Sequence, residues 1–287
     1  MTVPHDNHVG GRAPAGPQEG RPNMADDLSG TGVVSSREDG VLRLTLSRPE
    51  RLNALTYAAI DTIKAGYAEA ARDPGIRCVL IVGEGRAFCA GDDLTGMGEA
   101  PEGMDPVDRA QTLGYVTALR AARELGKPIV VGVQGYALGA GFELALSADV
   151  RVVARDARLG TRFIRLGLAS GAYLLPRAVG ITRAIDILFT GRELSGDEAD
   201  RWGLVTELVE TGDDVRAAAE AWAVRLSKMP TRALGYIKRV AYAASEMSME
   251  QGFRELAFSG AIAHATPDYL EAKRAWRAGE EPTFHGI

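Results

Sequence analysis

The chain has 287 residues, of which 46% are hydrophobic and 25% are charged, and its formal net charge is −5. This composition is typical of a globular protein large enough for one substantial domain. The acidic balance and the lack of a Lys/Arg run argue against a nucleic-acid-binding protein. Because Cys78 and Cys89 lie in or just after a predicted strand, we expect two free thiols. The Cys/His spacing of a zinc site is missing, so we expect no metal.

Residues 1–26 are rich in glycine, proline and polar side chains, and they lack the apolar stretch of a secretory signal. We expect a disordered extension there, then an α/β core over residues 27–210. A helical region over residues 211–287 completes the same functional unit. The longest apolar stretch, residues 129–146, is interrupted by polar residues and glycines, so it predicts a buried core segment. We therefore expect a cytoplasmic protein without membrane contacts.

The first predicted elements form a β-hairpin. Leucines alternate with polar residues between positions 42 and 46, which is the period of a half-buried strand. Asp39-Gly40 just before them is typical of a hairpin turn. Thr56 is suited to cap a following helix, and a buried strand is predicted over residues 78–82.

Strands and helices then alternate, which favours an α/β core. A helix is predicted over residues 107–125, followed by strands over residues 129–133 and 149–153. Ser195-Gly-Asp-Glu198 has the pattern of a capping box. The chain beyond Arg177 is mostly helical, with helices predicted over residues 184–189, 197–202, 215–227, 232–244, 249–264 and 269–278.

The stretch over residues 129–146 organises the rest of the chain. Its β-branched start predicts a buried strand, Gly139-Ala-Gly141 predicts a tight turn, and the residues after the turn favour a helix. Backbone N–H groups at such a helix start have no partner within the helix, and the positive end of the helix dipole lies behind them. The small residues of the turn let a ligand approach the backbone. We predict a site for an anion or a developing oxyanion.

Glu143 lies in the apolar first turn of this predicted helix. One interpretation is a structural charge that complements the helix dipole. The other is an acid/base group beside the oxyanion site, because a carboxylate in an apolar setting is typical of functional sites. The residues of this stretch alone leave both interpretations open.

Three motifs carry a resemblance to a known family. They are Arg51-Leu-Asn-Ala-Leu55, Arg86-Ala-Phe-Cys-Ala-Gly-Asp-Asp-Leu94 and the stretch from Gly135 to Leu144. In this order and spacing they resemble the enoyl-CoA hydratase/isomerase, or crotonase, superfamily, and three ordered motifs are more specific than one glycine pattern. The resemblance covers roughly Val33 to the C-terminus.

The resemblance implies a fold and a class of substrate. The fold is the α/β crotonase (ClpP-like) fold, in which stacked β-sheets are surrounded by helices and followed by a C-terminal helical region. The implied assembly is a homotrimer or a dimer of trimers, with the C-terminal helices packed across subunits. The implied partner is an acyl-CoA substrate, and no cofactor is expected beyond the coenzyme A that the substrate carries.

The resemblance also assigns the site. Crotonase-like enzymes bind the thioester carbonyl with two backbone N–H groups, which match Asp92 and Ala140, and the first catalytic acid/base group matches Glu143. Donors aimed at developing charge supply a large share of such catalysis. For Asp93, capping of a following helix is the alternative to a chemical role. The further substrate-binding and coenzyme A-binding positions are Leu52, Ala54, Ala90, Gly91, Asp93, Leu94, Gly139, Phe163 and Ser170.

The sequence departs from the family at the second catalytic glutamate. That residue normally ends a Gly-x-Pro-Glu segment, which reads Gly160-Thr-Arg-Phe163 in this chain. The position where some isomerases of the family place an acid matches Ser170. Hydration divides water activation and proton delivery between two carboxylates, so the loss of one disfavours standard hydration. Isomerisation, decarboxylation, carbon–carbon cleavage and a non-catalytic CoA-binding or assembly role stay open.

Overall fold

The computed structural model describes residues 30–98 and 102–286. The predicted extension over residues 1–26 lies outside the described residues. Within the described ranges, every helix is too short or too polar to cross a lipid bilayer. The strands are β1 (Val33–Glu38), β2 (Val41–Leu46), β3 (Cys78–Gly83), β4 (Ile129–Val133), β5 (Tyr136–Leu138), β6 (Val150–Ala154), β7 (Arg158–Gly160), β8 (Leu194–Ser195) and β9 (Glu207–Val209).

Six of these strands form one sheet in the order β1-β2-β3-β4-β6-β9. The β1–β2 pair is antiparallel, and the pairs from β2 to β9 are parallel. The predicted hairpin is confirmed: Asp39 and Gly40 have φ of 52° and 73°. Two consecutive positive φ angles are typical of a type I′ turn, whose twist matches that of the strands it joins. The turn therefore fixes the register that places Val41 beside Glu38.

A second, three-stranded sheet has the order β5-β7-β8. β5 follows β4 after a turn at Gln134 and Gly135, and it pairs with β7 in parallel from Tyr136–Arg158 to Leu138–Gly160. The sequence predicted only a turn after the strand, and not a further strand. β5, in this small sheet, connects the end of β4 to the turn before the next helix.

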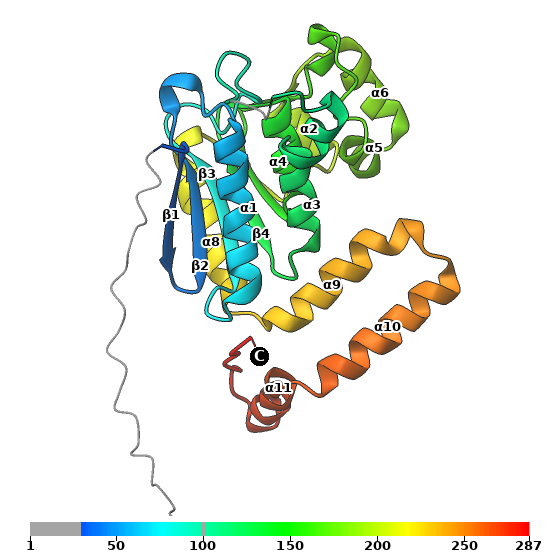
Figure 1. The fold of residues 1–287 in the computed structure, drawn as a ribbon. Coiled ribbons are helices and arrows are strands. Elements are labelled where there is room, and N and C mark those ends of the chain that lie inside the picture. The colour runs from blue at the N-terminus through cyan, green and yellow to red at the C-terminus, as the bar shows by residue number, and fades with distance from the viewer. Residues whose placement is uncertain (1–29, 99–101, 287) are drawn as a thin grey trace, which may run out of the picture.

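Helices cover both faces of the six-stranded sheet (Figure 1). On one face α1 packs on β1, β2 and β3 and against α3, and on the other face α8 packs on β2, β3, β4 and β6. The helices are α1 (Tyr57–Arg72), α2 (Pro106–Thr112), α3 (Val116–Glu124), α4 (Ala140–Ser147), α5 (Leu174–Val179), α6 (Ile181–Thr190), α7 (Gly196–Arg201), α8 (Gly212–Ser227), α9 (Thr231–Ala243), α10 (Met249–His264) and α11 (Pro267–Ala278), with short 3₁₀ turns at Pro49–Arg51, Phe163–Leu166 and Ala244–Glu246.

The two faces of the sheet have separate hydrophobic clusters. Leu80 and Val130 point to the α8 side and pack with Ala219 and Ala223. Neighbouring residues on the same strands, such as Ile81, belong to the larger cluster on the α1, α3 and α4 side. Burial of both faces explains why β3 and β4 are continuous apolar runs rather than alternating ones. Both cysteines are buried free thiols, as predicted.

The prediction of a single helix over residues 107–125 is wrong, because two helices occupy this segment. α2 ends at Thr112, and α3 begins at Val116 after a break around Gly114. α2 buries none of its residues, whereas α3 buries Ala118 and Ala122 against the core. Glycine weakens a helix, and only the second half has an apolar contact to compensate.

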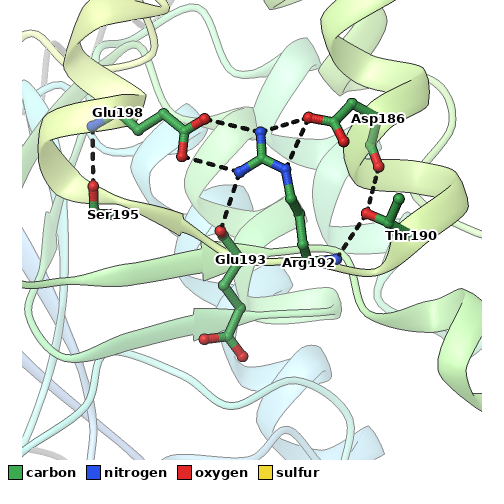
Figure 2. Close-up of polar contacts among 6 residues, drawn as sticks. All are labelled: Asp186, Thr190, Arg192, Glu193, Ser195 and Glu198. Carbon is green, nitrogen blue, oxygen red and sulfur yellow. Dashed lines mark hydrogen bonds and ion pairs between the residues drawn. The ribbon is translucent and has the colours of Figure 1, made fainter.

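The predicted capping box at the start of α7 is half formed (Figure 2). The Ser195 hydroxyl accepts a hydrogen bond from the Glu198 N–H (3.2 Å), but the Glu198 carboxylate does not return to the Ser195 backbone. It binds Arg192 instead, at 3.0 and 2.8 Å. Arg192 Nε also donates to Asp186 at 2.8 Å, so this guanidinium joins α6 to α7. A bidentate ion pair competes successfully with the capping bond because two charged contacts replace one.

The helices from α9 to α11 extend beyond the sheet layers as an arm (Figure 1). α9 is tied to the core through Asp149, whose carboxylate accepts hydrogen bonds from Lys238 (2.8 Å) and Tyr242 (2.9 Å). Asp149 also accepts from the Ile129 N–H at 2.8 Å, so one carboxylate links α9 to the start of β4. α8, by contrast, belongs to the layered core.

Candidate active site

The loop after β3 runs beside β5 and brings two distant segments together. The N–H of Cys89 donates to the carbonyl of Tyr136 (2.9 Å), and the N–H of Leu138 donates to the carbonyl of Cys89 (3.0 Å). Gly91 then lies against the start of α4: a Cβ atom on it would be 2.9 Å from the Leu138 carbonyl oxygen and 3.5 Å from the Ala140 nitrogen. With φ of 106° and this close approach, position 91 requires glycine.

Two backbone N–H groups, those of Asp92 and Ala140, are free at this junction. Ala140 is the first residue of α4, where an N–H has no acceptor within its own helix. Gly139, with φ of 53°, makes the turn into the helix. Over the residues that the structure describes, neither N–H donates a hydrogen bond. Two free donors on adjoining segments are the arrangement that stabilises an oxyanion.

Glu143 is buried in the first turn of α4, with only 2% of its surface exposed. Its Oε1 atom has no hydrogen-bond partner among the described residues. Burial raises the pKa of its carboxyl group to about 7. Such a group can give or take a proton near neutral pH, which is what general acid–base catalysis requires. This environment supports the acid/base interpretation of Glu143 over the helix-dipole interpretation.

Residues from three other segments surround Glu143. A Cβ atom on Gly171 would be 3.3 Å from Glu143 Oε1, so the loop that carries Ser170 passes directly over the carboxyl group. Phe163 is buried, and a Cβ atom on Gly139 would be 3.6 Å from its ring. Ser170 lines a cavity together with Glu143, and the Phe163 ring lies beside Gly139 and Tyr115.

Tyr115, just before α3, is a site residue that the sequence analysis missed. Its ring stacks on the ring of Phe163 with centroids 5.8 Å apart. Burial raises the pKa of its hydroxyl to about 12, and the negative charge of Glu143 acts in the same direction. Hydrogen bonding to Ser170 lowers that pKa, and the charge of Asp92 raises it again. The sequence predicted only a helix over residues 107–125, which does not separate a site residue from a core residue.

Residues of this cluster line two cavities. The first, the outer cavity, has a volume of about 270 Å³, and Arg162 and Arg165 are among the residues that line it. The predicted positions along its wall are Ala90, Gly91, Asp92, Leu94, Gly139 and Phe163. An inner cavity of about 590 Å³ is lined by Glu143, Tyr115 and Ser170 together with apolar residues such as Leu119 and Leu174.

Asp92 also brings a side chain to the outer cavity. Its Oδ1 atom is buried and has no hydrogen-bond partner among the described residues. Burial raises the pKa of this carboxyl group to about 6. The sequence predicted only a backbone role for Asp92. Its unpaired carboxyl group is a second feature of the site that the structure adds.

Asp93 does not cap a helix and does not line either cavity. Its carboxylate accepts hydrogen bonds from Arg48 at 2.8 Å and from the N–H and hydroxyl of Thr95 at 3.1 and 3.0 Å. The hydrogen bond from Arg48 is the main reason that the pKa of Asp93 is lowered to about 2. Arg48 also donates to the Ala54 carbonyl at 2.9 Å, so the pair anchors the loop that carries Asp92. The capping alternative for Asp93 is therefore wrong.

Leu52 and Ala54 contact the site through their backbone. The Leu52 carbonyl accepts a hydrogen bond from the Ala90 N–H at 2.9 Å. The neighbouring Leu55 N–H donates to the Gly91 carbonyl at 2.7 Å, and the Leu55 carbonyl accepts from the Asp93 N–H at 2.8 Å. This segment therefore holds the loop after β3 in place, although neither predicted residue lines the two cavities.

The similarity to known proteins extends over the segments that form this site. The family model for "Enoyl-CoA hydratase/isomerase" matches residues 36–276, which include the three motifs and the site. The chain belongs to this family. The resemblance that the motifs predicted is thereby confirmed.

Relatives of this hydratase/isomerase family member are named for different activities. It is 34% identical over 269 residues to the 1,2-epoxyphenylacetyl-CoA isomerase of Escherichia coli K12, covering 88% of this chain and 98% of the relative. It is 32% identical over 260 residues to the carnitinyl-CoA dehydratase of Salmonella typhimurium, covering 88% and 97%. The names include an isomerase and a dehydratase, so the family alone does not fix the reaction.

Solved structures confirm the predicted fold class for this family member. An enoyl-CoA hydratase from Polaromonas sp. JS666 superposes with a TM-score of 0.81 at 29% sequence identity, covering 88% of this chain and 99% of that one. The enoyl-CoA hydratase from Bacillus anthracis gives 0.81 at 26% identity, covering 89% and 100%. The protein therefore has the crotonase fold.

Proposed function

We propose that this protein is an acyl-CoA isomerase that forms a thioester enolate and transfers a proton with Glu143. The free N–H groups of Asp92 and Ala140 bind the thioester oxygen and stabilise the enolate. The observation that carries the proposal is the buried, unpaired Glu143 carboxyl group, which lies in the helix whose first N–H is one of these donors. A neutral-pH pKa suits this group to proton transfer.

Phe163 is the reason to propose isomerisation rather than hydration. The match of residues 160–163 to the family's segment assigns its ring to the position of the second carboxylate, and a ring cannot activate a water molecule. Stacking against Tyr115 makes this part of the site apolar on both sides. An apolar site raises the pKa of Glu143 and favours proton exchange between the carboxyl group and substrate carbon.

The two cavities support an acyl-CoA thioester as the substrate. Arg162 and Arg165 on the outer cavity offer guanidinium groups that suit the phosphates of coenzyme A. The inner cavity, which Glu143 lines, includes apolar residues such as Leu119 and Leu174 beside Arg120 and Arg123, and this apolar part suits an acyl chain. The proposed reaction uses no cofactor beyond the coenzyme A of the substrate.

We also propose that the protein works in the cytoplasm as a homotrimer or a dimer of trimers. In a single chain, the arm of α9–α11 exposes apolar side chains to water. Clusters of this kind mark protein–protein contacts. The exposed residues are Ile237, Met249, Phe253, Leu256, Phe258 and Trp276.

Glu143→Gln tests the proposed function. The amide keeps the size of the side chain but cannot take up or release a proton in this range, so turnover of a 3-enoyl-CoA should fall at least ~100-fold. Binding of a non-reactive acyl-CoA should stay within about threefold, because the phosphate and apolar contacts are unchanged. Glu124→Gln, an exposed site on α3, is the matched control and should behave as the wild type. Retention of turnover within about threefold in Glu143→Gln would overturn the assignment and leave decarboxylation, cleavage or CoA binding as the role.

A further inference from the structure

Buried carboxylate oxygens without a hydrogen-bond partner single out two residues of this site. Among the described residues such oxygens belong to Glu69, Asp92 and Glu143. Glu69 forms an ion pair with Arg37, so its charge is compensated. Asp92 and Glu143 have no such partner, and each lines one of the two cavities. An uncompensated buried carboxyl group costs stability, which is tolerated where it has a function.

We infer that the side chain of Asp92 is a second catalytic proton-transfer group, and that it acts on the opposite end of the reacting carbons from Glu143. This inference rests on the proposed function. It assigns to Asp92 a role beyond its backbone N–H. Asp93, the neighbouring carboxylate, does not suit this proton-transfer role, because it is bound by Arg48 and Thr95 and lines neither cavity.

The positions of the two carboxyl groups order them along a substrate. Asp92 lines the outer cavity, which the proposed function assigns to the coenzyme A part, and under that proposal its N–H binds the thioester oxygen. Glu143 lies on the inner cavity, which receives the acyl chain. The carbon next to the thioester, C2, is therefore nearer to Asp92, and C4 is nearer to Glu143. Tyr115 lines the same cavity as Glu143, and the charges of Glu143 and Asp92 both raise the pKa of its hydroxyl.

The reaction then balances with two protons. The Asp92 carboxylate takes a proton from C2 of a 3-enoyl thioester, and the electron pair of the broken C–H bond moves to the thioester oxygen. The N–H groups of Asp92 and Ala140 hold this oxyanion. Glu143, as the acid, then gives its proton to C4, and the electrons return to leave the double bond between C2 and C3. Proton exchange with water restores both carboxyl groups.

The order of the two pKa values agrees with these roles. Burial raises the pKa of Glu143 to about 7 and that of Asp92 to about 6. Between these values the prevailing form has a proton on Glu143 and a charge on Asp92, as an acid and a base require. Two groups with separated pKa values in one site are the usual sign of such a division.

Asp92→Asn is the first test. The variant keeps the backbone N–H, so the oxyanion hole stays complete while the proton acceptor is lost. We expect kcat for a 3-enoyl-CoA to fall at least ~100-fold with little change in KM. Asp92→Glu should recover part of the loss. Asp108→Asn, which removes an exposed carboxylate from α2, should leave turnover unchanged.

An isotope measurement on the wild-type protein gives a second, independent test. With a 3-enoyl-CoA deuterated at C2, two separate groups release the label to water and place a solvent proton at C4. A single shuttling carboxyl group would carry part of the label from C2 to C4. We expect no deuterium at C4 of the product. Label at C4, or Asp92→Asn activity within about threefold of the wild type, would overturn the inference.

The outcomes separate this inference from the proposed function. If the wild type turns over the substrate, Glu143→Gln is inactive and Asp92→Asn is active, the proposed function stands and the role of Asp92 is wrong. If the wild type neither isomerises the 3-enoyl-CoA nor exchanges its C2 protons, both are wrong. If Asp92→Asn does not fold, the label distribution in the wild-type product decides.

Discussion

The ring of Tyr115 stacks on the ring of Phe163, with centroids 5.8 Å apart and planes inclined by only 13°. The two residues come from different segments, one just before α3 and the other in the 3₁₀ turn after β7. Tyr115 also lines the cavity that contains Glu143, so the stacked pair adds apolar surface to the site. Burial in this site raises the pKa of Glu143.

Phe163→Glu should raise the hydratase activity of the protein above that of the wild type. The new carboxylate would stand where the family uses one to activate water, and hydration of crotonyl-CoA should rise at least ~100-fold if it is well placed. The cost is a buried charge and the loss of the stack, so the melting temperature should fall. Phe163→Leu is the control, because it also removes the stack but adds no carboxylate. An equal rise in hydration in both variants would contradict the account.

The stability of the protein should depend on the protonation of Glu143. Its pKa is raised from 4.5 to about 7, so the folded state binds a proton more tightly than the unfolded state. Its contribution to stability is complete below pH ~4.5 and is lost as the pH rises through about 7. The loss amounts to about 3 kcal/mol, at 1.36 kcal/mol per pKa unit.

Urea unfolding of wild type and Glu143→Gln at pH 5 and pH 8 measures this contribution. The amide does not titrate, so the variant should gain stability relative to the wild type as the pH rises. A stability difference between the two proteins that is the same at both pH values would show that burial does not perturb Glu143.

Ala140→Pro should remove one oxyanion donor without breaking α4. Ala140 is the first residue of the helix, where proline is tolerated because its missing N–H has no helical partner. We expect kcat to fall about 100-fold to 1,000-fold with the circular dichroism spectrum unchanged. Ala140→Gly keeps the N–H and is the matched control. If a folded Ala140→Pro variant has normal turnover, this N–H is not a donor.

Asp93→Asn should destabilise the protein through Arg48. The Asp93 side chain is 6% exposed and its carboxylate lies 2.8 Å from Arg48 Nη2, so the variant leaves a half-buried guanidinium without its charged partner. We expect a loss of about 2 kcal/mol in urea unfolding. Asp61→Asn breaks the exposed Lys64 pair instead and should cost less than about 1 kcal/mol. Equal losses in the two variants would mean that burial of the Arg48 pair has no effect.

The elements predicted best are those specified by nearby residues. The turn at Asp39-Gly40 needs two positive φ angles, and Thr56 caps α1 by accepting from the Ala59 N–H at 3.1 Å. The position of Glu143 on the first turn after a glycine bend followed from the same local pattern. Such features depend on a few neighbouring residues, so they can be predicted from the sequence.

The features that the sequence analysis missed depend on contacts between distant residues. β5 has three residues and exists because β7 pairs with it. The ion pair of Glu198 with Arg192 and that of Asp93 with Arg48 replace capping bonds that the local sequence favoured. The stack of Tyr115 on Phe163 and the unpaired Asp92 oxygen likewise depend on how separate segments pack. Local propensity does not determine such tertiary contacts.

The central claim is that a single chemical feature, Phe163 in place of a carboxylate, directs this crotonase-fold protein from hydration to isomerisation. The most direct measurement compares kcat/KM of the wild type for crotonyl-CoA hydration with that for isomerisation of a 3-enoyl-CoA of the same chain length. The account predicts that isomerisation is faster by at least about 100-fold. Efficient hydration, with kcat/KM of about 10⁶ M⁻¹s⁻¹ or more and no preference for the 3-enoyl substrate, would contradict it.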